Sequence, residues 1–209
     1  MVLFCYHKSY KAFVQWIVMM RLLRRPFLHN LIDITTVDPR IRLDIRYATP
    51  NNFCQKALYA QPVCYVHKDV AQALKAVQDE LAPQGLFLKL FDGYRPVSVQ
   101  QVMWDLIQDE NYVMNPAKGK GRHTRGTAID LTLVDASGNE LEMPSVFDDF
   151  TERAHRDNKN QTPEARKNMK LLEHAMQVQG FSGWPLEWWH YDFNGWHDDT
   201  KYPSLDIPI

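Results

Sequence analysis

Two stretches, residues 121–130 and 187–190, constrain the fold of this chain more than any other feature. The first reads GRHTRGTAID and the second EWWH, and each supplies one histidine and one carboxylate. Three of these side chains match a catalytic zinc site, in which three protein ligands leave one position for water. The fourth is then available as a general base. The fold must therefore bring residues about sixty positions apart to one cation, with His123, Asp130 and His190 as its ligands and Glu187 as the base.

The pattern around Asp130 supports this interpretation. Residues 128–134 alternate in the way that predicts a strand. Asp130 lies on the strand face opposite to the apolar side chains, which are those of Ile129, Leu131 and Leu133. A carboxylate in the middle of a core-forming strand is costly unless it is paired or bound to a metal. We therefore expect Asp130 to have a cationic partner.

The spacing of Glu187 and His190 leaves two local structures open. The two residues are three positions apart, so a regular strand would place them on opposite faces. Either Glu187 lies in the loop before the strand, or a bulge separates the two residues. The tryptophans between them are expected to pack in the core and to keep the site dry.

A turn upstream, residues 92–96 with the sequence DGYRP, holds a further candidate. Arg95 follows the end of a predicted strand and precedes a proline, so its position is fixed. A peptide hydrolase needs a cation or donor where negative charge develops on the carbonyl oxygen, and Arg95 suits this role. Asp92 is placed to orient Arg95 through a charge-assisted pair.

The remaining histidines are expected to lie outside the site. His197 forms a rival cluster with Asp198 and Asp199, but it lies in a polar tail and is expected to be solvated. Isolated histidines are seldom metal ligands, and this applies to His7, His29, His67, His155 and His174.

The order of predicted elements indicates one α+β domain with a mainly antiparallel central sheet and helices packed on it. Helix and strand patterns are mixed without strict β-α-β alternation, and residues 136–139 predict a hairpin turn. The predicted helices cover residues 69–81, 98–108 and 162–179, and the predicted strands cover 41–47, 86–91, 128–134 and 188–193.

Length and charge restrict the classes of partner. The chain has 209 residues, which suits one domain with a substantial core. Its 24 basic and 25 acidic side chains give a formal net charge of −1, so there is no overall basic field for nucleic acid or an anionic membrane. The three cysteines lack Cys-x-x-Cys spacing and indicate a reducing, cytoplasmic location, with a Cys54–Cys64 bridge left open.

Residues 1–28 are interpreted as an N-terminal extension, amphipathic or disordered, that precedes a catalytic domain of residues 29–209. An apolar run over 12–20 follows two lysines, but it is too short to span a bilayer and no small-residue cleavage site follows it. We expect no stable membrane span. A periplasmic location is the alternative if this segment acts as a signal.

Taken together, these motifs resemble the VanX-type D-alanyl-D-alanine dipeptidases, which are zinc enzymes related to D-Ala-D-Ala carboxypeptidases. The likeness extends over about residues 31–206 and includes HxxGxAxD from His123, ExxH from Glu187 and the DGYRP turn. It implies a hedgehog/DD-peptidase-like fold, one Zn²⁺ per chain and hydrolysis of D-Ala-D-Ala in peptidoglycan metabolism.

The resemblance also implies individual roles. The zinc ligands, base and oxyanion group would be those already described. The resemblance places Tyr47 and Asp148 near the amino end of the substrate, and we include Asp92 among the expected substrate-binding residues. The family often has a serine two residues before its first histidine, where this chain has Gly121. The hydrogen bond that such a hydroxyl makes would be lost or replaced, with Arg122 and Thr124 as candidates.

Two other functions remain open at this point. A D,D-carboxypeptidase acting on longer peptidoglycan peptides would use the same metal and base. A zinc-containing binding module without catalysis would need neither Glu187 nor Arg95. The oligomeric state is not predicted by the sequence.

Overall fold

A computed structural model describes residues 30–119 and 121–209. The predicted extension over residues 1–28 lies outside the described residues, as do His7, His29 and Cys5. Within the described part of the chain, no helix is long and apolar enough to cross a membrane.

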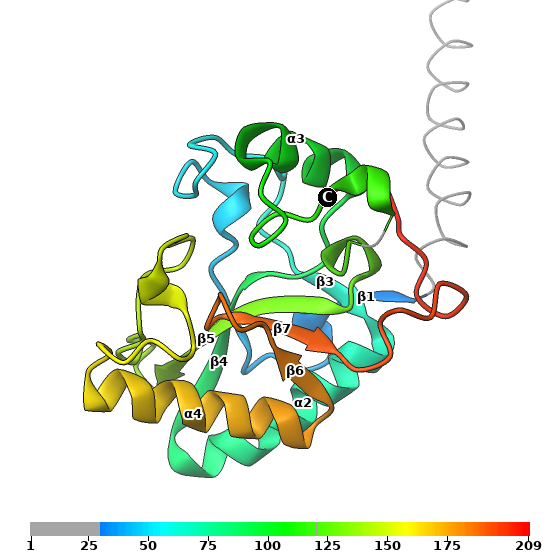
Figure 1. Ribbon diagram of the computed structural model, residues 1–209. Helices are drawn as coiled ribbons and strands as arrows, with labels where there is room; N and C mark the ends of the chain where they lie inside the picture. The colour runs from blue at the N-terminus through cyan, green and yellow to red at the C-terminus, as the bar shows by residue number, and fades with distance from the viewer. Residues whose placement is uncertain (1–29, 120) are drawn as a thin grey trace, which may run out of the picture. The chain divides into compact units, whose positions relative to one another are not determined.

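The core of the fold is a five-stranded sheet with the strand order β2-β4-β5-β7-β6 (Figure 1). β2 pairs with β4 in parallel, whereas the other three pairings are antiparallel. This confirms the predicted α+β class with a mainly antiparallel sheet. The strand bounds are β2 Arg42–Leu43, β4 Leu86–Asp92, β5 Ala128–Asp135, β6 Phe181–Gly183 and β7 His190–Phe193. A second, two-stranded sheet consists of β1 Leu31–Asp33 and β3 Tyr65–His67.

Two long helices, α2 (Lys68–Leu81) and α4 (Pro163–Val178), pack on the sheet and against each other. Each has an apolar stripe that is buried in the core. Both begin with a side-chain cap: His67 Nδ1 accepts from the amide of Asp69, and Thr162 Oγ1 accepts from that of Ala165. Their bounds confirm the predicted helices within one residue at each end.

The other face of the sheet carries the third helix, α3 (Val97–Ile107), and long loops (Figure 1). α3 also confirms its prediction, within one residue. The loops matter more for function, because one pocket is lined mostly by residues of loops and 3₁₀ turns, together with Gln100 of α3, Asp130 of β5 and His190 of β7. The sheet therefore supplies a rigid base and the loops supply the walls.

The predicted strand over residues 41–47 is largely wrong. Only Arg42–Leu43 pairs in the sheet. The amide of Asp44 still bonds to the carbonyl of Leu90, but the chain then turns into a 3₁₀ helix over Arg46–Ala48. This turn buries Tyr47, which is 2% exposed. The sequence alternates between polar and apolar residues through Tyr47 because the 3₁₀ turn, like a strand, buries one of its sides.

The last strand begins two residues later than predicted. The amide of Trp188 bonds to the carbonyl of Ala154 rather than to a strand, and β7 starts only at His190. The predicted turn after β5 is present, with Gly138 at φ +92°, but the returning chain makes a single bridge between Val134 and Glu140 instead of a full hairpin. β1, β3 and β6 were not predicted, since three residues are too few to show a period.

Candidate metal centre and substrate pocket

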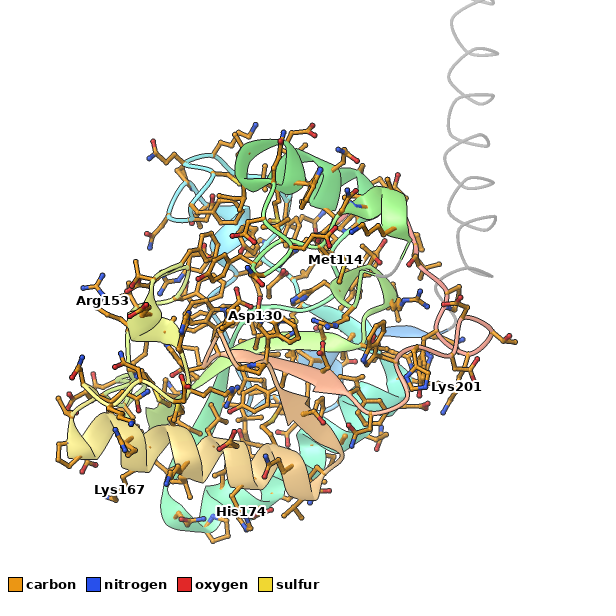
Figure 2. The ribbon with its side chains drawn as sticks, in the orientation of Figure 1. Met114, Asp130, Arg153, Lys167, His174 and Lys201 are labelled. Carbon is orange, nitrogen blue, oxygen red and sulfur yellow. The ribbon has the colours of Figure 1, made fainter. Side chains whose placement is uncertain are left out.

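Three of the predicted site residues meet in the structure. His123 opens a short 3₁₀ turn, Asp130 lies in β5, and His190 is the first residue of β7. Asp130 and His190 are direct cross-strand partners, so the sheet register itself brings residues sixty positions apart together. All three side chains are buried, between 3% and 7% exposed. Figure 2 shows Asp130 near the middle of the domain, below the loop that carries Met114.

The three candidate ligand atoms have the spacing of a metal site. His123 Nε2 is 3.2 Å from His190 Nδ1 and 3.4 Å from an Asp130 oxygen, and His190 Nδ1 is 3.0 Å from the other oxygen. Ligands bonded at about 2.0–2.1 Å in a tetrahedron are about 3.3 Å apart. The pocket side of this triangle is therefore suited to a metal ion with one further position open.

Outer partners fix the orientation of both rings. The remaining nitrogen of His123, Nδ1, is 2.8 Å from the carbonyl oxygen of Gly93 and can only donate to it. The remaining nitrogen of His190, Nε2, is 2.9 Å from Asp192 Oδ1. With these nitrogens protonated, the two facing nitrogens keep their lone pairs for a metal, as is usual in histidine metal sites.

The electrostatics of the cluster also favour a cation at its centre. Burial lowers the pKa of His190, but the charge of Asp192 and hydrogen bonds to Asp130 and Asp192 raise it to about 10. The pKa of Asp130 is lowered; burial opposes this effect, which comes from His123 and His190. Both shifts favour positive charge among these groups, which a bound metal ion would supply.

Glu187 lies in the turn before β7, which resolves the alternatives in favour of a loop without a bulge. The amide of Glu187 bonds to the carbonyl of Trp184, and the amide of His190 bonds to the carbonyl of Glu187. This turn aims the carboxylate at the cluster, with Oε2 3.9 Å from His190 Nδ1. Burial is the main effect that raises its pKa to about 8. A buried carboxylate at this distance from the candidate metal ligands has a position suited to a general base.

Arg95 is fixed beside the same cluster. Its Nε and Nη2 donate to Asp92 Oδ2 at 2.9 and 2.7 Å, and its Nη1 donates to Gln100 at 2.9 Å. Nη2 also lies 3.8 Å from Asp130. The side chain lines the pocket and is only 6% exposed, so its charge is held at the metal site.

Asp92 occupies a different position from the one expected of a substrate-binding residue. It is 1% exposed and does not line the pocket. Besides Arg95, its carboxylate accepts from Tyr59 Oη at 2.8 Å and from the amide of Gly93 at 2.9 Å. We therefore propose that Asp92 orients Arg95 and does not contact substrate.

Asp148 and Tyr47 lie on the wall of the same pocket. Tyr47 Oη donates to Asp148 Oδ1 at 2.9 Å, and the amide of Phe53 donates to Oδ2 at 3.3 Å. Burial is the main effect that raises the pKa of Asp148 to about 7. A carboxylate that is this poorly solvated is prepared to pair with a cation on a ligand.

Asp148→Asn should raise the thermal midpoint of the metal-free protein at pH 8. The folded-state pKa of Asp148 is about 7, while that of an unfolded-chain aspartate is about 3.9. The folded protein therefore binds a proton more tightly, so this carboxylate costs stability progressively as pH rises between the two values. Asparagine avoids the cost. Thermal denaturation should show a clear gap between the proteins at pH 8 and a smaller one at pH 5; a gap independent of pH would contradict the assignment.

The other histidines among the described residues lie away from the cluster, as expected. His174 and His197 are exposed, and Figure 2 shows His174 at the periphery on α4. His67 is buried, but its Nδ1 caps α2. Cys54 and Cys64 are both free thiols.

Some residues of the site were not predicted from the sequence. Asp192 follows His190 by two positions in a strand, so the two side chains share a face, and this spacing could have identified it. No comparable signal marks the other pocket residues, which are Gln100 of α3 and loop residues that include Phe53, Asn111, Tyr112 and Trp184.

Comparison with known proteins shows which family this chain resembles in sequence. The Peptidase_M15 model, described as D-ala-D-ala dipeptidase, matches residues 28–207. A D-alanyl-D-alanine dipeptidase of Escherichia coli (strain K12) is 38% identical over 176 residues, covering 84% of this chain and 89% of the relative. One from Enterococcus faecium is 33% identical, covering 81% of this chain and 93% of the relative. Among solved structures, VanYB in complex with D-Alanine-D-Alanine is 17% identical with a TM-score of 0.42, over 66% of this chain and 76% of that one.

Proposed function

The chain belongs to the D-Ala-D-Ala dipeptidase family of metallopeptidases, and on this premise we propose that it hydrolyses the free dipeptide D-Ala-D-Ala to two D-alanines. The observation that carries the proposal is the meeting of three candidate metal ligands with a buried carboxylate and a buried guanidinium in one pocket. A binding module without catalysis would need neither of the last two groups.

We propose one Zn²⁺ per chain, held by His123 Nε2, His190 Nδ1 and the Asp130 carboxylate. The spacing of these atoms and the outer bonds of both imidazoles support this assignment. The donor set of two imidazoles and one carboxylate suits zinc. Bound there, zinc would act as a Lewis acid toward the peptide carbonyl and lower the pKa of water.

Glu187 is proposed as the group that moves the proton. It removes a proton from the attacking water and then delivers it to the amine of the leaving D-alanine. Its burial supports the second half of this role, because a raised pKa allows the carboxyl group to hold the proton between the two transfers. A bound cation would lower that pKa toward neutrality.

Arg95 is proposed to stabilise the negative charge that develops on the carbonyl oxygen. Three of its nitrogens are held by Asp92 and Gln100, so the guanidinium does not need to reorganise during the reaction. A preorganised charge in a buried site stabilises the transition state far more than the same charge does in water.

Asp148 is proposed to bind the ammonium group of the substrate, with Tyr47 fixing its carboxylate. This assignment favours a dipeptidase over a D,D-carboxypeptidase. A longer peptide has a neutral amide where the dipeptide has its ammonium, and a buried carboxylate would then lack a charged partner. Phe53 also lines this pocket, and its backbone amide donates to Asp148 Oδ2.

Purified zinc-loaded protein should release D-alanine from D-Ala-D-Ala far faster than from a D-Ala-D-Ala-terminated pentapeptide. It should release little alanine from L-Ala-L-Ala. Removal of zinc by a chelator should abolish the activity, and added zinc should restore it. Faster cleavage of the pentapeptide would instead favour the carboxypeptidase, and zinc binding without any cleavage would favour the binding module.

We propose further that residues 29–209 form the catalytic domain and that residues 1–28 are an extension without a catalytic role. The free thiols of Cys54 and Cys64 support a cytoplasmic location.

A further inference from the structure

Arg122 differs from Arg95 in how its guanidinium nitrogens are paired. Arg95 and Arg122 are the two arginines that line the pocket among the described residues. Every side-chain nitrogen of Arg95 has a hydrogen-bond partner. Neither Nη atom of Arg122 forms a hydrogen bond with any described residue, and its Nε forms only an ion pair, 3.2 Å from Asp192 Oδ2.

The side chain of Arg122 is nevertheless held in place. Its guanidinium carbon lies 4.6 Å from the ring centroid of Trp184 and 5.1 Å from that of Trp196. Trp184 is itself fixed, since its Nε1 donates to the carbonyl of Asn111 at 3.0 Å. The side chain is only 18% exposed. A guanidinium that is stacked, ion-paired at Nε and unpaired at both Nη atoms is preorganised to bind an anion with its free edge.

The neighbouring residues explain why an arginine takes this task. A Cβ at Gly121 would lie 2.9 Å from Thr124 Oγ1, so a serine would not fit here without a shift. The hydroxyl of Thr124 already has partners and is not free to bind substrate, since it donates to the carbonyl of Gly121 at 2.7 Å and lies 3.0 Å from Ser204 Oγ. Of the two candidates for a replacement hydrogen bond, Arg122 alone lines the pocket.

We propose that Arg122 binds the C-terminal carboxylate of the dipeptide, an inference that rests on the proposed function. The substrate is a zwitterion, and the pocket has a matching pair of groups. Both residues line this pocket, and they share no contact: Asp148 contacts Tyr47 and Phe53, whereas Arg122 contacts Trp184, Trp196 and Asp192. Arginine can bind a carboxylate with two parallel hydrogen bonds.

The structure also offers a second role for Arg122. Asp192 lies between Arg122 Nε and His190 Nε2, so Arg122 could act only by positioning a metal ligand. The two roles differ in one measurable respect. A residue that binds the substrate carboxylate discriminates the dipeptide from its C-terminal amide, whereas a positioning residue affects both ligands equally.

Equilibrium binding of D-Ala-D-Ala and D-Ala-D-alaninamide to the zinc-loaded Glu187→Gln protein tests the proposal without turnover. Adding Arg122→Gln should weaken binding of the acid about 10- to 100-fold, the usual value for a hydrogen bond to a charged group, and leave binding of the amide nearly unchanged. Arg122→Lys should fall between the two proteins, because it keeps the charge but not the fork. Arg153→Gln, at a 73% exposed side chain, is the control and should change neither affinity.

An equal loss for acid and amide, or a loss of zinc in Arg122→Gln, would overturn the proposal in favour of a positioning role. Equal affinity of acid and amide for the protein that retains Arg122 would also overturn it. The proposed function is tested separately by D-alanine release from the unmutated enzyme, so binding of the acid through Arg122 without release would contradict the hydrolase and leave the carboxylate site standing.

Discussion

Glu187→Gln is expected to retain its zinc and to lose about 10²- to 10⁴-fold in kcat, the range that a positioned general base contributes. Glutamine keeps the size and the polarity of the side chain, but it cannot accept a proton from water. The loss should fall on kcat, since Glu187 is not one of the three proposed ligands and its Oε2 lies 3.9 Å from His190 Nδ1.

Glu110→Gln is a matched control for this variant. Glu110 also lines the pocket, but its carboxylate pairs with the exposed Lys118 at 2.6 Å. The same chemical change there should leave kcat within about twofold, as expected for a surface ion pair of little energetic value. Near-full turnover in Glu187→Gln would remove this residue from the proton transfer, and loss of its zinc would show that it is a ligand.

His123→Ala should lose the metal itself. Removing one of three protein ligands is expected to weaken zinc binding by more than the roughly 100-fold that loss of an outer partner costs. Zinc content after dialysis and D-alanine release should fall together. Asp192→Asn leaves the three proposed ligands in place but alters the outer partner of His190 and the ion pair with Arg122, and it should show the smaller effect of about 10- to 100-fold in zinc affinity.

His174→Ala is the control for the ligand variant, because His174 is an exposed histidine on α4. It should keep wild-type zinc content and activity. Unchanged zinc in His123→Ala would contradict the proposed ligand set.

The sequence predicted the candidate metal ligands better than the residues that line the pocket around them. Asp130 and His190 could be selected because a carboxylate in a core strand and a histidine next to a tryptophan pair are unusual in a local pattern. Their convergence depends on the β5–β7 register, which local periodicity does not contain. The three longer helices were predictable because each repeats an apolar stripe over three or more turns.

The errors have a common physical cause. The strand over residues 41–47 failed because a tertiary hydrogen bond and the burial of Tyr47 outweighed a local alternation. The contact of Asp92 with Arg95 could be predicted because the two residues are three positions apart, whereas its contact with Tyr59, 33 positions away, has no local signal in the sequence. The free edge of Arg122 could not be inferred from sequence, since it depends on which side chains pack around the guanidinium.

Anomalous diffraction at the zinc edge from crystals of the zinc-loaded protein tests the central claim most directly. We expect one peak per chain within about 2.0–2.2 Å of His123 Nε2, His190 Nδ1 and an Asp130 oxygen. A peak bound instead at His197 with Asp198 and Asp199, or one that contacts only one of the two imidazoles, would contradict it.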